Sequence, residues 1–330
     1  MDGEQAMIQN SLRESISAFD ERERNIVLSH LDNIEKNAPR SKHTISYVLA
    51  KAFREMGKPL LMITKRDVIA FLNSIDKNKA DSTKVQYFCH LEKFFAFAVD
   101  SFDMDNIDFK NPMPSTAFFK FTQNPMKKRT AKFLTMEQLK SILKLSYKKS
   151  KKEYIFFLLV IHTGMRPSEC CGIRIEDIHI PERYLETGKE NWCAKSTRHM
   201  NQPLEFCFSR EVAAQIKDYL LYINRKSGWL FTSTKSLDEP MSFRTAFEMS
   251  RKYSEWLGFK FTMNYFRHTV ISNRKQTFDG ESGKPKIDDW ESEILMNHIP
   301  KSTENKKYLE KPIEFKRKLF DRYYVYKGLI

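Results

Sequence analysis

The stretch "YIFFLLVIHTGMRPSEC" at residues 154–170 runs from an uninterrupted apolar segment into a glycine, an arginine and a proline. The apolar segment predicts a helix that ends at Gly164, the residue type that most readily closes a helix in a left-handed turn. Pro167 suits the first position of a new helix. The sequence therefore places Arg166 at the junction of two helices, where an arginine needs an explanation.

Arg166 at a helix start lies where backbone amides and the helix dipole favour an anion, and Glu169 in the same first turn can brace it. Cleaving a phosphodiester without a metal calls for such groups. Guanidinium groups from separate segments neutralise the nonbridging oxygens, and a tyrosine phenol attacks in line and can leave again. A lysine or histidine then protonates the departing sugar oxygen.

Thr163, Gly164, Arg166 and Glu169 match the pattern T-G-x-R-x-x-E, and here the chain resembles the tyrosine recombinase family, also called phage integrases. The resemblance covers nearly the whole chain. Residues from about 12 to 115 look like the helical core-binding domain of this family, and residues 128–310 look like its catalytic domain.

Two further family elements are similar in this chain. The hairpin lysine of the family corresponds to Lys195 in "AKSTRHMNQPL", with Lys189 as the alternative if the register differs. The second box, H-x-x-R-H-T, appears as "NYFRHT", which implies that Arg267 is the second catalytic arginine and His268 its usual follower. Asn264 replaces the expected histidine, and an amide cannot exchange a proton near neutral pH.

The third box, L-G-H, appears as "LMNH", so the resemblance implies His298 as the matching histidine and puts Asn297 in the glycine position. Asparagine is the next-best residue for a left-handed turn, which allows the same backbone shape. Tyr308 follows ten residues after His298, the spacing of the family's nucleophile. Three tail tyrosines are rivals that lie too far along the chain: Tyr323, Tyr324 and Tyr326.

We expect a mainly α fold with a small β-hairpin or sheet in the C-terminal domain, in the two-domain architecture of the tyrosine recombinases: a helical core-binding domain and a mixed α+β catalytic domain. The expected divisions are a polar segment over 1–11, the core-binding DNA clamp over 12–115, a linker over 116–130 and the catalytic domain over 131–330, with a tail from about 311.

Local patterns predict individual elements. Helical spacing of apolar residues predicts helices within 45–53, 68–72, 85–99, 209–224, 243–257, 265–275 and 313–324. Capping boxes are expected at Thr64 with Asp67 and at Thr135 with Gln138. Segments 190–195 and 201–208 read as a β-hairpin, and 277–293 reads as an inserted loop.

The charge is strongly one-sided along the chain. Residues 1–126 hold 17 Lys and Arg against 17 Asp and Glu, whereas residues 127–330 hold 39 against 25, which is the whole net charge of +14. The stretch 127–152 alone has ten basic residues and one acidic residue. This density suits a phosphate backbone. The residues expected to bind DNA are Lys127, Lys128, Arg129 and Lys132.

Several classes of protein are excluded by composition. No apolar stretch approaches the length of a membrane span, and the start "MDGEQAMIQNS" lacks the features of a secretory signal. The five cysteines show no C-x-x-C spacing, and we expect reduced, buried thiols. The expected location is the cytoplasm or nucleoid, or the nucleus if the host is eukaryotic.

The resemblance implies a site-specific recombinase or integrase, from a virus or mobile element, that cuts and rejoins double-stranded DNA through a 3′-phosphotyrosyl intermediate. It implies no cofactor and no metal, and a homotetramer on two DNA sites; whether accessory DNA-bending proteins take part stays open. Two alternatives stay open: an enzyme like a type IB topoisomerase or telomere resolvase, and a catalytically silent DNA-binding protein on the same fold.

Overall fold

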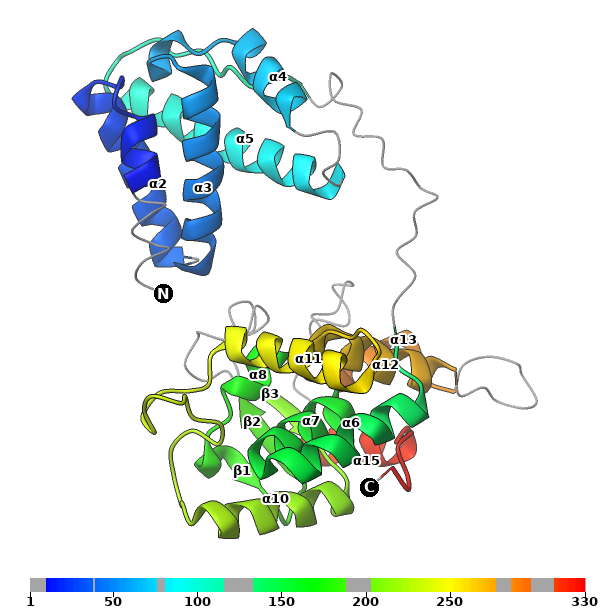
Figure 1. Cartoon of the computed structure of the whole chain (residues 1–330). Coiled ribbons are helices and arrows are strands. Elements are labelled where there is room, and N and C mark those ends of the chain that lie inside the picture. Colours follow the sequence, from blue (N-terminus) through cyan, green and yellow to red (C-terminus); the bar gives the residue numbers. More distant parts are fainter. Residues whose placement is uncertain are drawn as a thin grey trace. The chain divides into compact units, whose positions relative to one another are not determined.

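The computed structural model describes residues 10–37, 39–75, 81–115, 133–187, 203–276, 286–297 and 312–329. The chain divides into two compact units, Met1–Lys128 and Arg129–Ile330. Figure 1 shows the elements of each unit. None of the helices within the described residues is long and apolar enough to cross a membrane.

The described part of the first unit is helical. Its elements are α2 (Glu21–Asn37), α3 (Pro39–Met56), the 3-10 helix η1 (Leu60–Met62), α4 (Lys65–Ser74) and α5 (Asp81–Met104). Helices α2, α3 and α5 pack on one another around a phenylalanine-rich core. The expected capping box of α4 is present, with Asp67 accepting hydrogen bonds from the backbone and hydroxyl of Thr64 at 2.9 and 2.7 Å.

The second unit combines helices with a small sheet, which confirms the predicted fold class. Its elements are α6 (Met136–Lys149), α7 (Lys151–Thr163), α8 (Pro167–Cys171), η2 (Ile175–Asp177), β1 (Ile178–His179), β2 (Tyr184–Thr187), β3 (Leu204–Cys207), α10 (Arg210–Ile223), α11 (Phe243–Leu257), α12 (Met263–Lys275), α13 (Asp289–Leu295) and α15 (Ile313–Arg322). The Thr135–Gln138 capping box starts α6 as predicted.

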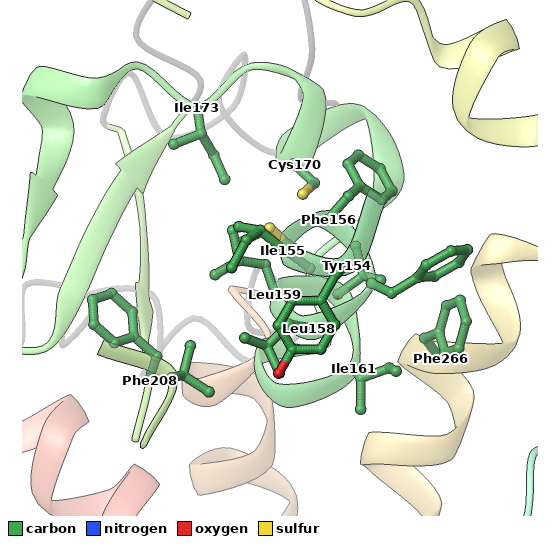
Figure 2. Packing of buried hydrophobic residues seen from close by; sticks show 14 of the residues in the cluster. Tyr154, Ile155, Phe156, Leu158, Leu159, Ile161, Cys170, Ile173, Phe208 and Phe266 are labelled. Carbon is green, nitrogen blue, oxygen red and sulfur yellow. The ribbon is translucent and has the colours of Figure 1, made fainter. Parts of the chain in front are cut away.

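Helix α7 is the central element of the second unit. Every residue from Tyr154 to Thr163 is buried, because α6, α10 and α12 all pack against this helix. Figure 2 shows its apolar side chains extending in several directions, with Phe266 of α12 on one side and Ile173 and Phe208 on another. A helix that is apolar all round is stable only when enclosed in this way.

Within the described residues, three strands form one antiparallel sheet in the order β1-β2-β3, with Leu185 opposite Phe206. Strand β3 confirms the second strand predicted within 201–208. Its described partner is β2, which the sequence did not predict because its four residues are too few for a clear alternation. The expected first strand at 190–195 lies outside the described residues.

The predicted loop over 277–293 is wrong in its last part, because α13 begins at Asp289. Asp288 caps this helix: its Oδ1 accepts a hydrogen bond from the Glu291 amide at 2.6 Å, and the Glu291 carboxylate accepts one from the Asp288 amide at 3.4 Å. A capping box can start a short helix in a polar segment where hydrophobic periodicity gives little signal.

The tail packs on its own unit. Helix α15 lies against β3 and α13, and Leu319 and Phe320 are buried there. Arg183 forms two hydrogen bonds with the Asp321 carboxylate, at 2.9 and 2.6 Å. Beyond the helix, Tyr324 lies 2.6 Å from Nδ1 of His162, at the end of α7. The C-terminal segment therefore packs beside the helix that precedes Arg166.

The described cysteines have free thiols, in agreement with the predicted reduced state. Cys170, Cys171 and Cys207 are buried and Cys89 is half-buried, whereas Cys193 lies outside the described residues. Burial raises the pKa of Cys207 to about 12 and raises that of Cys170 strongly. High thiol pKa values keep the reactive thiolate rare.

A histidine pair links α2 and α5 in the first unit. His30 is buried between the rings of Phe94 and Phe97, with ring centroids at 5.4 and 5.1 Å. Burial, assisted by the nearby His90, lowers the pKa of His30 to about 4. Burial also lowers the pKa of His90, whose Nε2 has no hydrogen-bond partner. The folded unit therefore resists protonation at this pair.

We expect the first unit to lose stability as the pH falls from about 6.5 towards 4, since the unfolded chain binds the proton that folded His30 excludes. For His30 alone, the free energy of unfolding should fall by about 2 kcal/mol between pH 7 and about 5. The measurement is urea unfolding of the full chain followed by far-UV circular dichroism.

All four tryptophans lie in the second unit, so tryptophan fluorescence follows that unit separately. His30→Gln should flatten the pH dependence of the first unit's transition, whereas His43→Gln on α3 should leave it in place. An equal pH slope in wild type and His30→Gln would contradict the assignment.

Candidate functional site

The turn at Gly164 fixes the start of the site. Gly164 ends α7 with a φ of 72°, a left-handed conformation that favours glycine. The Thr163 hydroxyl holds both sides of this turn, donating to the Leu159 carbonyl at 2.6 Å and accepting from the Met165 amide at 3.2 Å. A Cβ at position 164 would also lie only 2.8 Å from Cε of Met296.

Arg166 caps α8 and is braced by Glu169. One nitrogen of its guanidinium donates to Oε1 of Glu169 at 2.7 Å, and its backbone amide donates to Oε2 of the same carboxylate at 2.6 Å. Glu169 is fully buried, whereas the Arg166 side chain is 33% exposed. The buried Glu169 carboxylate therefore fixes the partly exposed guanidinium of Arg166, as expected from the sequence.

The expected contribution of the helix start to anion binding is smaller than the sequence suggested. Helix α8 has only five residues, and the Glu169 carboxylate already accepts the Arg166 amide at its first turn. A short helix has a weak dipole, and a fixed carboxylate opposes a second anion. Attraction of a phosphate at this position therefore depends on the guanidinium groups themselves.

Arg267 is the buried counterpart of Arg166. Its Nη1 donates to the Gly164 carbonyl at 2.9 Å and its Nη2 to the Met296 carbonyl at 2.7 Å, and the residue is 8% exposed. Burial lowers its pKa to about 10, the Glu169 carboxylate opposes this shift, and Arg166 adds to it. The structure thus brings together both arginines and Glu169, and Arg267 keeps its charge at neutral pH.

Sequence reasoning missed two residues beside Arg267. Arg274, two turns further along α12, is buried, and its Nη1 lies 3.4 Å from Sδ of Met296. Its Nε has no hydrogen-bond partner, and burial lowers its pKa to about 10. Met296 fills the space above Gly164. A basic residue seven positions after Arg267 was the available signal, since this spacing puts both on one helix face.

The two polar neighbours of Arg267 on α12 are both exposed. Asn264 lies in the first turn of the helix and His268 directly follows Arg267. Because they are four residues apart, they occupy one side of the helix. Both side chains are therefore accessible from solvent.

Other predicted site residues lie outside the described residues. They are Lys195 and its alternative Lys189, His298, Tyr308, and the basic residues Lys127, Lys128, Arg129 and Lys132. Their roles stay predictions. Within the described residues, no three His, Cys, Asp or Glu side chains come together as a metal site would require.

The rival tail tyrosines are poorly suited to act as nucleophiles. The Tyr323 hydroxyl donates to the Glu291 carboxylate at 2.7 Å, and burial together with this carboxylate raises its pKa. Burial raises the pKa of Tyr324 to about 12 and also raises that of Tyr326. A phenol that is buried and resists ionisation is a weak nucleophile.

Comparison with known proteins agrees with this geometry. The model of the phage integrase family matches residues 132–274, a range that contains Arg166, Glu169, Asn264, Arg267 and His268. The tyrosine recombinase XerA of Pyrococcus furiosus is 25% identical over 239 residues, which cover 71% of this chain and 74% of the relative.

Solved structures show the same fold. The XerH site-specific recombinase bound to its difH substrate superposes with a TM-score of 0.58 at 15% identity, covering 94% of this chain and 92% of that one. A lambda integrase dimer bound to a COC' core site gives 0.57 at 17% identity, covering 86% and 76%. Residues 132–274 therefore match the phage integrase family, the tyrosine recombinases, enzymes that break and rejoin DNA.

Proposed function

We propose that this chain is a site-specific recombinase of a virus or mobile element that cuts DNA through a 3′-phosphotyrosyl intermediate. The observation that supports it most directly is the arginine junction. Arg166 presents a braced guanidinium at the surface, and Arg267 is tied to the preceding turn through the Gly164 carbonyl. Binding alone does not require one arginine braced by a buried carboxylate beside a second arginine fixed by backbone carbonyls.

In the proposed reaction, the Tyr308 phenol loses its proton to water, its oxygen attacks a backbone phosphorus, and the bond to the 5′ sugar oxygen breaks. Lys195 gives a proton to that oxygen, while Arg166 and Arg267 stabilise the charge on the nonbridging oxygens. His298, with His268 or Asn264, supports the transition state. The 5′-hydroxyl of a partner strand then attacks the phosphotyrosyl bond and releases Tyr308, so the energy of the broken bond is conserved.

The assembly we propose is a homotetramer on two DNA duplexes, with the two units of each chain clamping one duplex. The basic stretch 127–152 would lie on backbone phosphates, which position the protein without reading sequence. Residues 1–126 of the first unit carry no net charge. The contribution of this unit to DNA binding therefore depends on how its basic residues are distributed over its surface.

The nucleophile is tested by covalent trapping. The chain is incubated with nicked duplexes taken from the DNA that flanks its own gene, and a denaturing gel detects the protein–DNA adduct. We expect an adduct in wild type and none in Tyr308→Phe. An adduct that persists in Tyr308→Phe would refute Tyr308 as nucleophile, and bound duplexes without any adduct would favour the silent DNA-binding alternative.

Arg166→Ala should lower the single-turnover cleavage rate by about 10²–10³, because a preorganised donor to the transition-state charge is lost. Arg166→Lys should recover only part of the rate, since an ammonium lacks the planar fork. Arg210→Ala, an exposed arginine at the start of α10, is the matched control. Wild-type speed in Arg166→Ala would refute its role.

DNA affinity should fall steeply as salt is raised, with a slope in log–log form of about −0.9 for each phosphate neutralised. Replacing Lys127, Lys128, Arg129 and Lys132 together by alanine should make that slope shallower. The measurement is fluorescence anisotropy of a labelled duplex over a salt series. A slope equal to that of wild type would remove these four residues from the interface.

A further inference from the structure

Asn297 occupies a left-handed turn and has a side chain where the family pattern L-G-H has none. Its φ is 50°, and it directly follows Met296, the residue that ends α13. The side chain is buried, and its Nδ2 donates to the Glu205 carbonyl of β3 at 2.8 Å. The asparagine therefore keeps the backbone shape that a glycine would take and adds an anchor to the sheet.

Lys316 reaches the same point from the tail helix α15. Its Nζ donates to Oδ1 of Asn297 at 3.2 Å and to the Glu205 carboxylate at 3.0 Å. The Lys316 side chain is only 13% exposed, and that of Glu205 is 28% exposed. Limited exposure reduces solvent screening, so this contact differs from a freely solvated surface ion pair. Asn297 thus joins α13, β3 and α15.

The residue before Asn297 contacts Arg267, the second arginine proposed to act in catalysis. The Met296 carbonyl that accepts from Arg267 belongs to the peptide bond between Met296 and Asn297, and the amide of that same peptide donates to the Ile294 carbonyl at 3.1 Å. A peptide group is planar and rigid, so fixing Asn297 also fixes the direction of the Met296 carbonyl. The Met296 side chain in turn lies against Gly164.

We propose that Asn297 and Lys316 are positioning residues that make the placement of Arg267 depend on the docking of the tail. Lys316 holds Asn297, Asn297 holds the Met296 carbonyl, and that carbonyl holds Arg267. Removal of the tail contact leaves DNA binding intact and slows cleavage, because the guanidinium is displaced from its transition-state position. The effect on cleavage rests on the proposed function; the structural coupling does not.

The test compares Lys316→Met, Asn297→Gly and the double variant with wild type. Methionine keeps the apolar stem of the lysine, and glycine accepts the left-handed turn without a side chain. Lys318→Met is the matched control, because Lys318 is an exposed lysine on the same helix. The first readout is the single-turnover rate of adduct formation at saturating DNA, measured beside the DNA dissociation constant.

We expect the cleavage rate of each single variant to fall about tenfold. A distant mutation that displaces a catalytic group slightly can slow the reaction by this factor or more. DNA affinity should stay within about twofold of wild type. The double variant should be no slower than the slower single variant, because both substitutions break one chain of contacts. Lys316→Arg should recover most of the rate, and Lys318→Met should match wild type.

A second readout is independent of catalysis. Hydrogen exchange of the Met296 and Asn297 amides, which donate to the Ser292 and Ile294 carbonyls, should become about tenfold faster in Lys316→Met and remain unchanged in Lys318→Met. Unchanged exchange would overturn the coupling whether or not the protein cleaves DNA. Wild-type cleavage rates in Lys316→Met, or rate losses that multiply in the double variant, would also overturn it and leave the proposed recombinase function standing.

Discussion

The buried guanidinium of Arg267 is the interaction on which the second unit depends. Its two carbonyl acceptors belong to Gly164 and Met296, the residues that end α7 and α13. Helix C-termini present unpaired carbonyls with partial negative charge, so a cation placed between two of them is stabilised by both. An arginine buried without such partners would be costly, and removing it would leave two helix ends unsatisfied.

The two arginines differ in exposure and in the groups that hold them. Arg166 is partly exposed and held by Glu169, whereas Arg267 is mostly buried and joins segments distant in sequence. Glu169 acts on both, because its buried carboxylate supports Arg166 and offsets the effect of burial on the pKa of Arg267. A buried anion close to two cations reduces their mutual repulsion.

The sequence predicted the parts of this site that depend on local rules. The end of α7 at Gly164, the start of α8 at Pro167 and the bracing of Arg166 by Glu169 all follow from capping preferences and spacing within one turn. Helices such as α5, α10 and α11 follow from apolar periodicity in the same way, whereas α13 does not. Such signals depend on residues within a few positions of one another, so one sequence is enough to read them.

What could not be predicted depends on contacts between distant segments. Strand β2 is too short to show alternation, and the packing of Met296 above Gly164 joins positions that no local pattern relates. Arg274 shows the limit of local signals: its spacing of seven from Arg267 puts both on one helix face, but a basic residue predicts exposure, and the fold buries it beside Met296. Its burial follows from its position on the inner face of α12, and only the assembled core defines that face.

Asn297 and Asn264 both depart from the family pattern, but one replaces a residue needed for its backbone conformation and the other a residue needed for its side-chain chemistry. Asn297 replaces glycine at a position that requires a backbone conformation, and an asparagine adopts it while its side chain gains partners in β3 and α15. Asn264 replaces a histidine at a position where the residue type supplies chemistry, and an amide donates and accepts hydrogen bonds without titrating. His268, four residues further along α12, is exposed on the same side of the helix. The first departure therefore preserves the backbone shape of the site, whereas the second removes the titratable group that the family pattern has at that position.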